Sequence, residues 1–360
     1  MPRVALLIET SREYGRGLLR GIAWYLRRHG PWSVYFHPMG LDDPPPPWLK
    51  TWQGDGILAR INNDRMARAV LASGLPAVDL RGALTGLELP HIGPDNRMVV
   101  GHALDHLIDR GFRHFAFYGA PAGQFRFLDL RRALFQDLVA QSSYKCSIFG
   151  EQYKPGRRES WERRQQRIAV WLQNLSKPVG LMCSSDEEAL DVLDACRRAE
   201  LAVPDQVAVV SVDNDEYICL FARPTLTSVD VNLEEIGCQA AALLDRMMAG
   251  EKPPEAAVRV PPRSVVARRS TEAWALPDEQ IGAVVRYIRD HACEGIDVDS
   301  LLEHCTLSRR TLERRFKELM GRTLNAEILR VRLESARRAL ARTQLPVTKV
   351  AVNSGFHSIS

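Results

Sequence analysis

Short apolar runs alternate with amphipathic helical patterns along the first three quarters of the chain, and this alternation restricts the fold more than any other feature. The predicted strands are residues 4–8, 32–36, 56–59, 77–80, 115–118, 179–183 and 207–212. The predicted helices are residues 17–28, 66–72, 99–109, 128–139, 187–199 and 234–248. Because parallel strands are joined by crossover helices, the pattern predicts a doubly wound α/β domain. The repeats exceed what one compact sheet holds, so we expect two lobes with a cleft between them.

The composition excludes several classes of protein. Of the 360 residues, 45% are apolar and 26% are charged, as in ordinary soluble domains, so disorder is not expected. The apolar runs are strand-sized and no signal segment opens the chain, so we expect a cytoplasmic protein without a membrane span. Seven cysteines without a CxxC pair predict neither a disulfide framework nor a zinc site. A pI near 8.7 is only mildly basic and is weak evidence for a nucleic-acid partner.

From about residue 270 the pattern changes to helices alone. The predicted helices here are residues 281–291, 298–305, 309–319, 325–343 and 347–354. Residues 271–276 are the predicted linker between an α/β domain at 1–270 and an all-α domain at 277–360. On the long helix, one face carries Ile328, Leu329, Leu333, Ala336 and Leu340, which predicts that it packs as a spacer between two units.

The segment 298–319, VDSLLEHCTLSRRTLERRFKEL, has the pattern of two short helices joined by a tight turn. Ser308 stands where the N-cap of the second helix belongs. Leu312, Phe316 and Leu319 share one side of that helix, and the arginines lie on the other. A capped helix with a cationic outer face suits the major groove of B-DNA, so DNA is the predicted partner.

The cationic side of this helix supplies the expected DNA contacts. The predicted DNA-binding residues are Arg309, Arg310, Thr311, Arg314, Arg315 and Lys317. Arg310 and Arg314 are best placed to read bases, because a guanidinium can bind guanine O6 and N7 together. The side chains suited to phosphates are Arg309, Arg315, Lys317 and Arg322. The alternative is a solvated helix face without a partner.

Polar residues follow several predicted strands, at the edge where open α/β sheets bind ligands. These residues are Glu9, Ser11, Arg12, Arg60, Asp186, Asp213 and Asn214. Ionised carboxylates and guanidinium forks hold sugar hydroxyls through charge-assisted hydrogen bonds. Tyr14 and Phe127 can supply an aromatic wall for the apolar face of a sugar ring. A structural alternative stays open for each, since strand-end acids often cap the next helix and Phe127 can belong to the core.

Motifs of enzymes and metal sites are incomplete in this chain. GRGLLRG at 15–21 lacks the GxGxxG spacing of a dinucleotide loop. His102 and His106 form HxxxH on a helix, but without the glutamate of a metalloprotease or a third ligand. No GxSxG or catalytic Cys/His signature occurs. We therefore expect no catalytic residue, cofactor or metal. The enzyme alternative, a sugar-modifying α/β protein with a helical tail, leaves the arginine face unexplained.

Both parts of the chain resemble known families. Residues 277–360 resemble the AraC-type DNA-binding domain through SRRTLERRFKELMG, RLESARRAL and KVAVNSGFHS. Residues 4 to about 269 resemble the effector-binding module of the LacI/GalR repressors through GPDNRMVVGHALDHLIDRGFRHFAFYG, LAVPDQVAVVSVDND and RPTLTSVDVNLEEIGCQAAALL. A LacI-like sensor ahead of an AraC-like DNA reader resembles the order in bacterial regulators of xylose operons, and this similarity covers nearly the whole chain.

The resemblance implies a two-lobed, periplasmic-binding-protein-like sensor domain followed by a helix-turn-helix domain. It implies a transcription regulator, and an activator of sugar-catabolism genes, controlled by a small sugar such as xylose. It places Arg131 and Asp213 at positions that contact sugars in the LacI family. A homodimer on paired DNA half-sites is expected, with RNA polymerase as a further candidate partner. A helical tail that binds proteins instead of DNA is the remaining alternative.

The chain departs from the AraC pattern at two places. Thr306 stands in the first helix-turn-helix where the family usually has glycine, so we expect an altered turn. The second helix-turn-helix stops at Ser360, about where its reading helix would begin. We expect from this an incomplete second unit, weaker DNA binding and fraying of residues 347–356.

Overall fold

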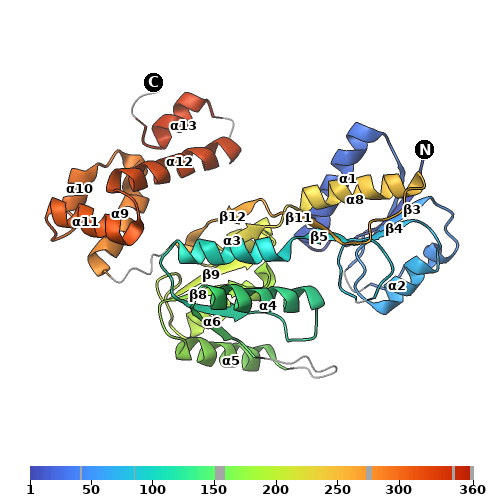
Figure 1. The fold of residues 1–360 in the computed structure, drawn as a ribbon, viewed down its shortest axis with the longest axis horizontal. Helices are drawn as coiled ribbons and strands as arrows, with labels where there is room; N and C mark the ends of the chain where they lie inside the picture. The colour runs from blue at the N-terminus through green and yellow to red at the C-terminus, as the bar shows by residue number, and fades with distance from the viewer. Residues whose placement is uncertain (41–42, 85, 151–158, 273–277, 343–344, 357–360) are drawn as a thin grey trace. The chain divides into compact units, whose positions relative to one another are not determined.

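The structure is a computed structural model that describes residues 1–40, 43–84, 86–150, 159–272, 278–342 and 345–356. The chain divides into two compact units, Met1–Asp109 with Arg113–Glu272, and Arg110–Phe112 with the residues after Glu272 (Figure 1). Sheets and helices make up the N-terminal unit, and helices alone occur in the described part of the C-terminal unit. The predicted fold class, a two-lobed α/β domain followed by an all-α domain, is confirmed.

Two separate, mostly parallel sheets form the two lobes of the N-terminal unit. The first has the order β2-β1-β3-β4, with β1 at Arg3–Leu7, β2 at Ser33–Phe36, β3 at Gly56–Ala59 and β4 at Ala77–Asp79. The second has the order β12-β10-β9-β8-β6-β7, with β6 at His114–Tyr118, β7 at Lys145–Ile148, β8 at Val179–Cys183, β9 at Val207–Val212, β10 at Thr227–Asp230 and β12 at Ser264–Val266. Among the described strands, β12 alone pairs antiparallel, with β10. A short parallel pair, β5 at Ile92–Pro94 and β11 at Val258–Val260, lies apart from both sheets.

Helices cover these sheets. Those of the first lobe are α1 (Glu13–His29), α2 (Asp64–Leu71) and α8 (Leu233–Met248). Those of the second lobe are α3 (Asn96–Ile108), α4 (Arg126–Gln141), α5 (Trp161–Asn174), α6 (Asp186–Arg198) and α7 (Glu216–Phe221). Helices α5 and α6 pack through Ile168, Leu172 and Val192 on one face of the second sheet, and α3 contacts the same sheet at β8, β9 and β10. Two short 3₁₀ helices, Pro47–Lys50 and Arg269–Thr271, complete the unit.

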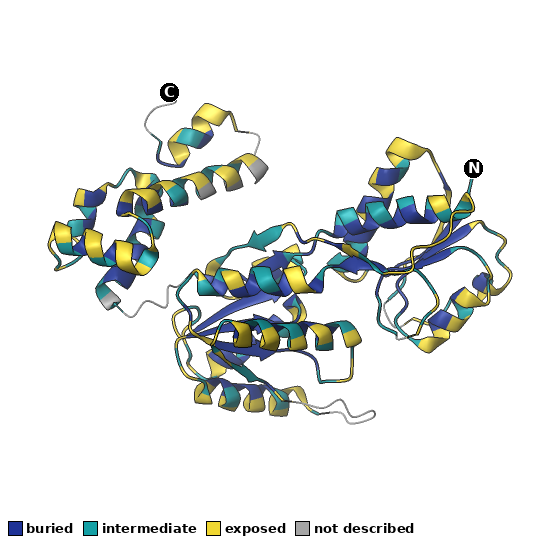
Figure 2. Ribbon diagram, viewed as in Figure 1, coloured by how far each residue is buried: buried dark blue, intermediate teal, exposed yellow. Residues whose placement is uncertain are grey.

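The central strands β8 and β9 are buried along their whole length, as Figure 2 shows in dark blue. Their sequences, VGLMC and VAVVSV, are continuous apolar runs except for one serine. Strands covered by helices on both faces need such runs, because no side of the strand meets water. These two strands carry the loops that begin at Ser184 and Asp213, so their burial fixes where those loops start.

Glycines let α1 and α8 approach closely. A Cβ on Gly21 of α1 would overlap the Glu234 carbonyl oxygen, and one on Gly237 of α8 would overlap the Leu18 carbonyl oxygen. A Cβ on Gly17 would press against the Leu233 side chain. The GRGLLRG segment is therefore a helix-packing surface, and it lies within α1 rather than in a phosphate-binding loop.

We predict that Gly21→Ala loosens this helix pair. The added methyl group must push α8 away, which typically costs about 1–3 kcal/mol in an overpacked core. Gly101→Ala in α3 is the matched control, since nothing lies within 4 Å of the added Cβ and alanine favours a helix by roughly 1 kcal/mol. Hydrogen exchange measured by mass spectrometry should be faster in α1 and α8 peptides of Gly21→Ala and unchanged or slower in α3 of Gly101→Ala. Equal protection of α8 in both variants would contradict the close packing.

The C-terminal unit is built from α9 (Glu279–His291), α10 (Val298–Leu302), α11 (Arg309–Met320), α12 (Leu324–Arg342) and α13 (Val347–Asn353), with a 3₁₀ turn at Ala292–Glu294. Its core includes Ile281, Ile288, Leu301, Leu312 and Phe316. Asp278, Asp297 and Ser308 cap α9, α10 and α11 through their side chains. The apolar faces and caps that the sequence pattern predicted for α11 are therefore present.

The turn between α10 and α11 differs from the expectation. Helix α10 ends at Leu302, three residues before the predicted end. The altered turn expected from Thr306 carries no backbone strain, because no described residue from 303 to 308 has a positive φ. The Thr306 hydroxyl instead accepts a hydrogen bond of 2.8 Å from Gln280 Nε2 of α9. Glycine is therefore not needed at this position.

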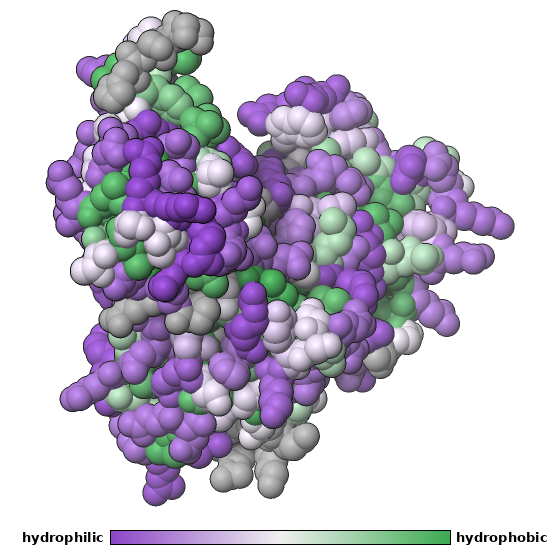
Figure 3. All heavy atoms as spheres, turned by 60° about the vertical axis from the view of Figure 1, so that its left-hand side comes forward, coloured by the Kyte–Doolittle hydropathy of each residue, from purple (hydrophilic) through white to green (hydrophobic). Residues whose placement is uncertain are grey.

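The long helix α12 is less covered than its sequence predicted. Ile328 is buried, but Leu329, Leu333 and Leu340 each expose about half of their surface: 49%, 54% and 51%. The prediction of one packed apolar face was wrong for these three leucines. Figure 3 shows hydrophobic side chains at the surface beside the grey residues near the top of that view. In α13, Val350 is buried whereas Val347 and Val352 are exposed, and residues 357–360 lie outside the described part.

Candidate functional site

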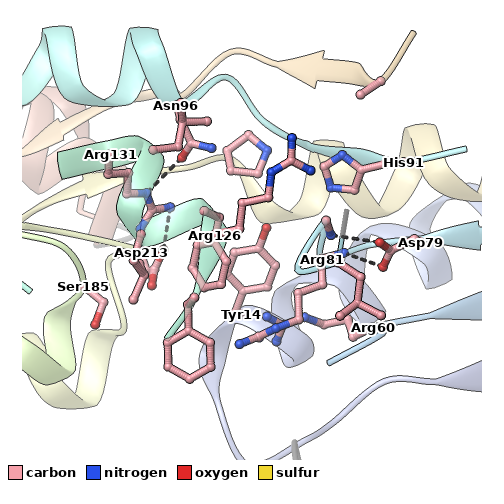
Figure 4. Close-up of a pocket in the computed structure, with 18 of the residues that line it drawn as sticks. Tyr14, Arg60, Asp79, Arg81, His91, Asn96, Arg126, Arg131, Ser185 and Asp213 are labelled. Carbon is pink, nitrogen blue, oxygen red and sulfur yellow. Dashed lines mark hydrogen bonds and ion pairs between the residues drawn. The ribbon is translucent and has the colours of Figure 1, made fainter. Parts of the chain in front are cut away.

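A cavity of about 840 Å³ lies in the N-terminal unit. Its walls include residues that follow strands of both sheets: Arg60 after β3, Asp79 at the end of β4, Asp186 after β8 and Asp213 after β9 (Figure 4). The carboxyl ends of parallel strands are where open α/β sheets bind ligands. The sequence pattern had placed Arg60, Asp186 and Asp213 at such ends, and the structure brings all three to one cavity.

Arg131 of α4 is the most buried cation of this cavity, with 1% of its surface exposed. Its Nε donates to Asn96 Oδ1 at 2.9 Å and its Nη1 donates to the Ser184 carbonyl at 2.7 Å. Its Nη2 lies 3.6 Å from Asp213 Oδ1. A buried guanidinium needs such partners. These contacts fix the orientation of the guanidinium. Its remaining N–H groups face the cavity beside Asp213 (Figure 4).

Asp213 and two aromatic residues surround the cavity-facing side of the Arg131 guanidinium. Asp213 has a φ of 105°, a conformation that Asp and Asn adopt more readily than bulky residues. Phe127 lies 5.8 Å from the Arg131 guanidinium, measured from the ring centre. Tyr14 also lines the cavity, and burial, with a further contribution from the Asp213 charge, raises the pKa of its hydroxyl. The neutral phenol can therefore donate or accept a hydrogen bond.

Two other predicted residues have their charges paired within the protein. Arg60 forms a buried ion pair with Glu9, and its guanidinium lies over the Tyr14 ring at 4.2 Å. Arg12 pairs with Glu187 at 2.9 Å, with both side chains partly exposed. Glu9 is buried and is not among the residues that line the cavity. Arg60 therefore lines the cavity with a guanidinium whose charge is already compensated by Glu9.

Asn214 and Asp186 serve the protein's own hydrogen bonds. Asn214 does not line the cavity, because its amide oxygen accepts from Arg268 Nη2 at 2.9 Å. Asp186 lines the cavity but accepts from the Ser211 and Ser228 hydroxyls and from the Asp215 amide. These contacts tie β8 to the ends of β9 and β10. Asn214 is therefore not among the residues that line the cavity, whereas Asp186 lines it and its predicted ligand contact stays a prediction.

We predict that Asp186 makes stability depend on pH. Burial, and secondarily the Asp213 charge, raises the pKa of Asp186 from 3.8 to about 7. Between these values the folded state keeps a proton that the unfolded state has released, so stability falls as the pH rises and levels off above about 7. Asp186→Asn cannot titrate, so the stability of the native protein relative to this variant should decrease from pH 5 to pH 8. Urea unfolding of both proteins at several pH values measures the difference, and a constant difference would refute the assignment.

Several cavity residues were missed by the sequence patterns. Asp79 accepts three backbone hydrogen bonds, from Ile61, Arg81 and Gly82, and so shapes the loop after β4. Asn96 holds Arg131. The further cavity residues Arg81, His91, Phe125, Arg126 and Arg259 come from loops, a helix start and the isolated strand β11. The predicted strand 77–80 contains Asp79 close to its carboxyl end, and this position was the signal that could have identified it.

Helix α11 presents the candidate DNA surface of the C-terminal unit. Arg310, Arg314 and Lys317 are exposed and recur every three to four residues, so they share one face. Leu312 and Phe316 on the opposite face are fully buried. Leu319, predicted to share that buried face, is 37% exposed. Thr311 lies in the first turn, where its hydroxyl contacts the Ser308 hydroxyl at 2.9 Å.

Ion pairs along α11 differ in burial. Arg309 pairs with Asp299 at 2.7 Å and with Glu313 at 3.1 Å, and Arg314 pairs with Glu318 at 2.9 Å. All of these side chains are at least half exposed. Such surface pairs contribute only about 0–1 kcal/mol, so a phosphate or base can replace the carboxylate.

Two predicted phosphate contacts are used inside the unit instead. Arg315 pairs with Asp278, the N-cap residue of α9, at 3.1 Å. Arg322 pairs at 2.7 Å with Glu327, which is 1% exposed and also binds Arg330. Glu327 is buried, so removing Arg322 would leave its charge less compensated, whereas the Arg315 side chain is 43% exposed. Arg315 and Arg322 therefore join helices of this unit, and their predicted phosphate contacts stay predictions.

The residues that the structure describes include no group of three or more His, Cys, Asp or Glu side chains arranged to hold a metal ion. His106 of the HxxxH pair instead contacts the Thr271 hydroxyl at 2.8 Å. In the described ranges, no helix combines the length and apolarity that crossing a membrane requires.

Comparison with known proteins agrees with this two-part layout. Periplasmic binding protein-like domains match residues 104–271, and helix-turn-helix domains match residues 301–360. The xylose operon regulatory protein of Escherichia coli (strain K12) is 33% identical over 368 residues, which cover 99% of this chain and 92% of that protein. The chain belongs to the family of xylose operon regulatory proteins. The member from Haemophilus influenzae is 29% identical over 364 residues, with 99% and 93% coverage.

Solved structures extend the family relationship to the fold. The structure of the xylose-binding transcription activator xylR matches with a TM-score of 0.69 and 32% identity, covering 99% of this chain and 92% of that one. A LacI family regulator from Enterococcus faecium with bound ribose matches with a TM-score of 0.57 and 19% identity, covering 75% and 98%. The latter likeness concerns the fold alone. The chain is a DNA-binding transcription regulator with a sugar-sensor domain, and not an enzyme.

Proposed function

We propose that this regulator is a homodimeric activator of sugar-catabolism genes whose effector is a pentose such as xylose. One observation carries the proposal: both domains, in the same order, align with a xylose operon regulatory protein over 99% of the chain. The cavity with Arg131 and Asp213 supports a polyol ligand. We place the regulator in the cytoplasm, with its DNA, and RNA polymerase is a further candidate partner.

The sugar would bind between Arg131 and Asp213. A vicinal diol can accept from the guanidinium and donate to the carboxylate, and both hydrogen bonds are charge-assisted. Phe127 and Tyr14 would cover the apolar face of the ring. Because the lining residues come from both lobes, a ligand that touches both favours their closed arrangement over an open one. A coupling of about 1–3 kcal/mol between effector and DNA would change operator occupancy roughly 5- to 150-fold.

We predict that Asp213→Asn weakens effector binding and leaves the fold intact. Asparagine has the same shape and tolerates the positive φ, but it lacks the charge that strengthens the hydrogen bond. The dissociation constant for D-xylose should rise roughly tenfold or more, measured by isothermal titration calorimetry. Asp205→Asn, at an exposed site outside the cavity, should bind like the unchanged protein. A panel of pentoses and hexoses in the same instrument tests the choice of xylose.

We propose that Arg310, Arg314, Lys317, Thr311 and Arg309 form the DNA-binding face. The first half of a recognition helix meets base edges, which favours Arg310 and Arg314 for reading bases and Lys317 for a phosphate. Their exposure and replaceable ion pairs support this assignment. We propose that α13 belongs to the second helix-turn-helix unit of this domain.

We predict different effects for two substitutions on this face. Arg310→Ala should reduce discrimination between operator and altered operator by about 1–3 kcal/mol. Lys317→Ala should weaken binding to all duplexes alike and reduce the slope of log affinity against log salt by about 1. Arg286→Ala on α9 is an exposed control that should change neither. Fluorescence anisotropy with promoter DNA across a salt series measures all three, and no loss for either α11 variant would reject this face.

A further inference from the structure

The cavity extends well beyond the residues proposed to hold the sugar. Its volume of about 840 Å³ lies near the upper end of the roughly 300–1,000 Å³ typical of small-molecule sites. Arg131 and Asp213 occupy one side. The other side is lined by Arg81, His91, Arg126 and Arg259, and Figure 4 shows the Arg126 side chain directed toward His91, away from Asp213. A single pentose between Arg131 and Asp213 would leave this second side empty.

Two arginines on this side are not neutralised. Arg126 begins α4, and Arg259 lies in the middle of β11, opposite Gly93 of β5. Both side chains are exposed, and across the described ranges neither has an ion pair or a hydrogen bond to another side chain. Glu88 and Glu255 also line the cavity, but neither is paired with these arginines in the described part of the chain.

His91 shows how close the two cations are. Burial first, and then the charges of Arg259 and Arg126, lower the pKa of His91 to about 4. The imidazole is therefore neutral at neutral pH. It adds no charge of its own, and its Nε2 has no hydrogen-bond partner among the described residues. A third guanidinium, that of Arg81, lies over the rings of Phe125 and Phe127, at 5.6 and 5.1 Å from their centres.

We propose that this second side of the cavity binds an anionic group attached to the pentose, so that an acidic derivative, a pentose phosphate or a sugar acid, binds more tightly than the neutral pentose. Guanidinium forks match the paired oxygens of phosphate and carboxylate, and a neutral pentose offers no group that uses two unpaired cations. The N-terminal end of α4, where Arg126 lies, adds a favourable dipole. The inference rests on the proposed function, because it assumes that the polyol lies between Arg131 and Asp213.

The test compares neutral and acidic pentoses on the full chain. Calorimetric titrations at low salt use D-xylose, D-xylonate, D-xylose 5-phosphate and inorganic phosphate. We expect the acidic derivative that fits to bind about tenfold or more tightly than D-xylose, and this preference to shrink as salt is raised. The comparison of D-xylonate with D-xylose 5-phosphate separates the two sources of the anion.

Variants of the two unpaired arginines test whether these residues cause the preference for an acidic derivative over D-xylose. Arg126→Gln with Arg259→Gln should abolish the preference and leave D-xylose affinity within about twofold. Arg97→Gln, an exposed residue of α3 outside the cavity, is the matched control and should behave like the unchanged protein. Circular dichroism confirms that the double variant is folded.

The outcomes separate this inference from the proposed function. D-xylose binding without a preference for either acid, or a preference that survives in the double variant, would overturn the inference alone. If the double variant lost affinity for D-xylose as much as for the acidic derivatives, the two arginines would act in lobe closure. That result would also overturn the inference. Binding of an acidic derivative without D-xylose binding would support the inference and reject xylose as the effector, whereas no binding of any probe would reject both.

Discussion

The guanidinium of Arg131 is the interaction on which the sensor domain depends. It is buried, and its charge is compensated by hydrogen bonds to Asn96 and the Ser184 carbonyl and by the nearby Asp213. These partners belong to α3, to the loop after β8 and to the loop after β9, and Arg131 itself belongs to α4. One side chain therefore joins four elements of the second lobe at the edge of its sheet. The cavity exists at this edge because strands and helices converge on that charge.

Sequence patterns predicted the parts of the fold where burial is complete. The apolar runs of β8 and β9 and the cap and apolar face of α11 were all recognised. Helix α5 was missed because its sequence, WERRQQRIAVWLQN, buries only a narrow stripe. The edge strand β7 is partly exposed and has a mixed sequence, KCSI, so it lacks the strand pattern as well. Elements at the margin of a sheet leave a weaker signal than those in its centre.

The candidate site was predictable only where a residue follows a recognisable strand. Asp213 met this condition, and Arg131 was placed by family resemblance. His91, Arg126 and Arg259 are far apart in the sequence, and only the pairing of β5 with β11 and the start of α4 bring them to one cavity wall. Whether an arginine is free or paired also depends on tertiary contacts, as Arg315 and Arg322 show. Local patterns cannot supply that information.

If α11 reads DNA as proposed, the carboxylates beside its arginines have a consequence for the search along a chromosome. Glu318 holds Arg314, and Glu313 holds Arg309, so a duplex must displace an internal counter-ion before either guanidinium can leave its partner. That expense is the same for every sequence, but only a site with well-placed base acceptors compensates it fully. Background DNA, whose base edges do not match the arginines, would then be held for shorter times than by arginines without such partners. These glutamates therefore favour fast release from wrong sites at the expense of overall affinity.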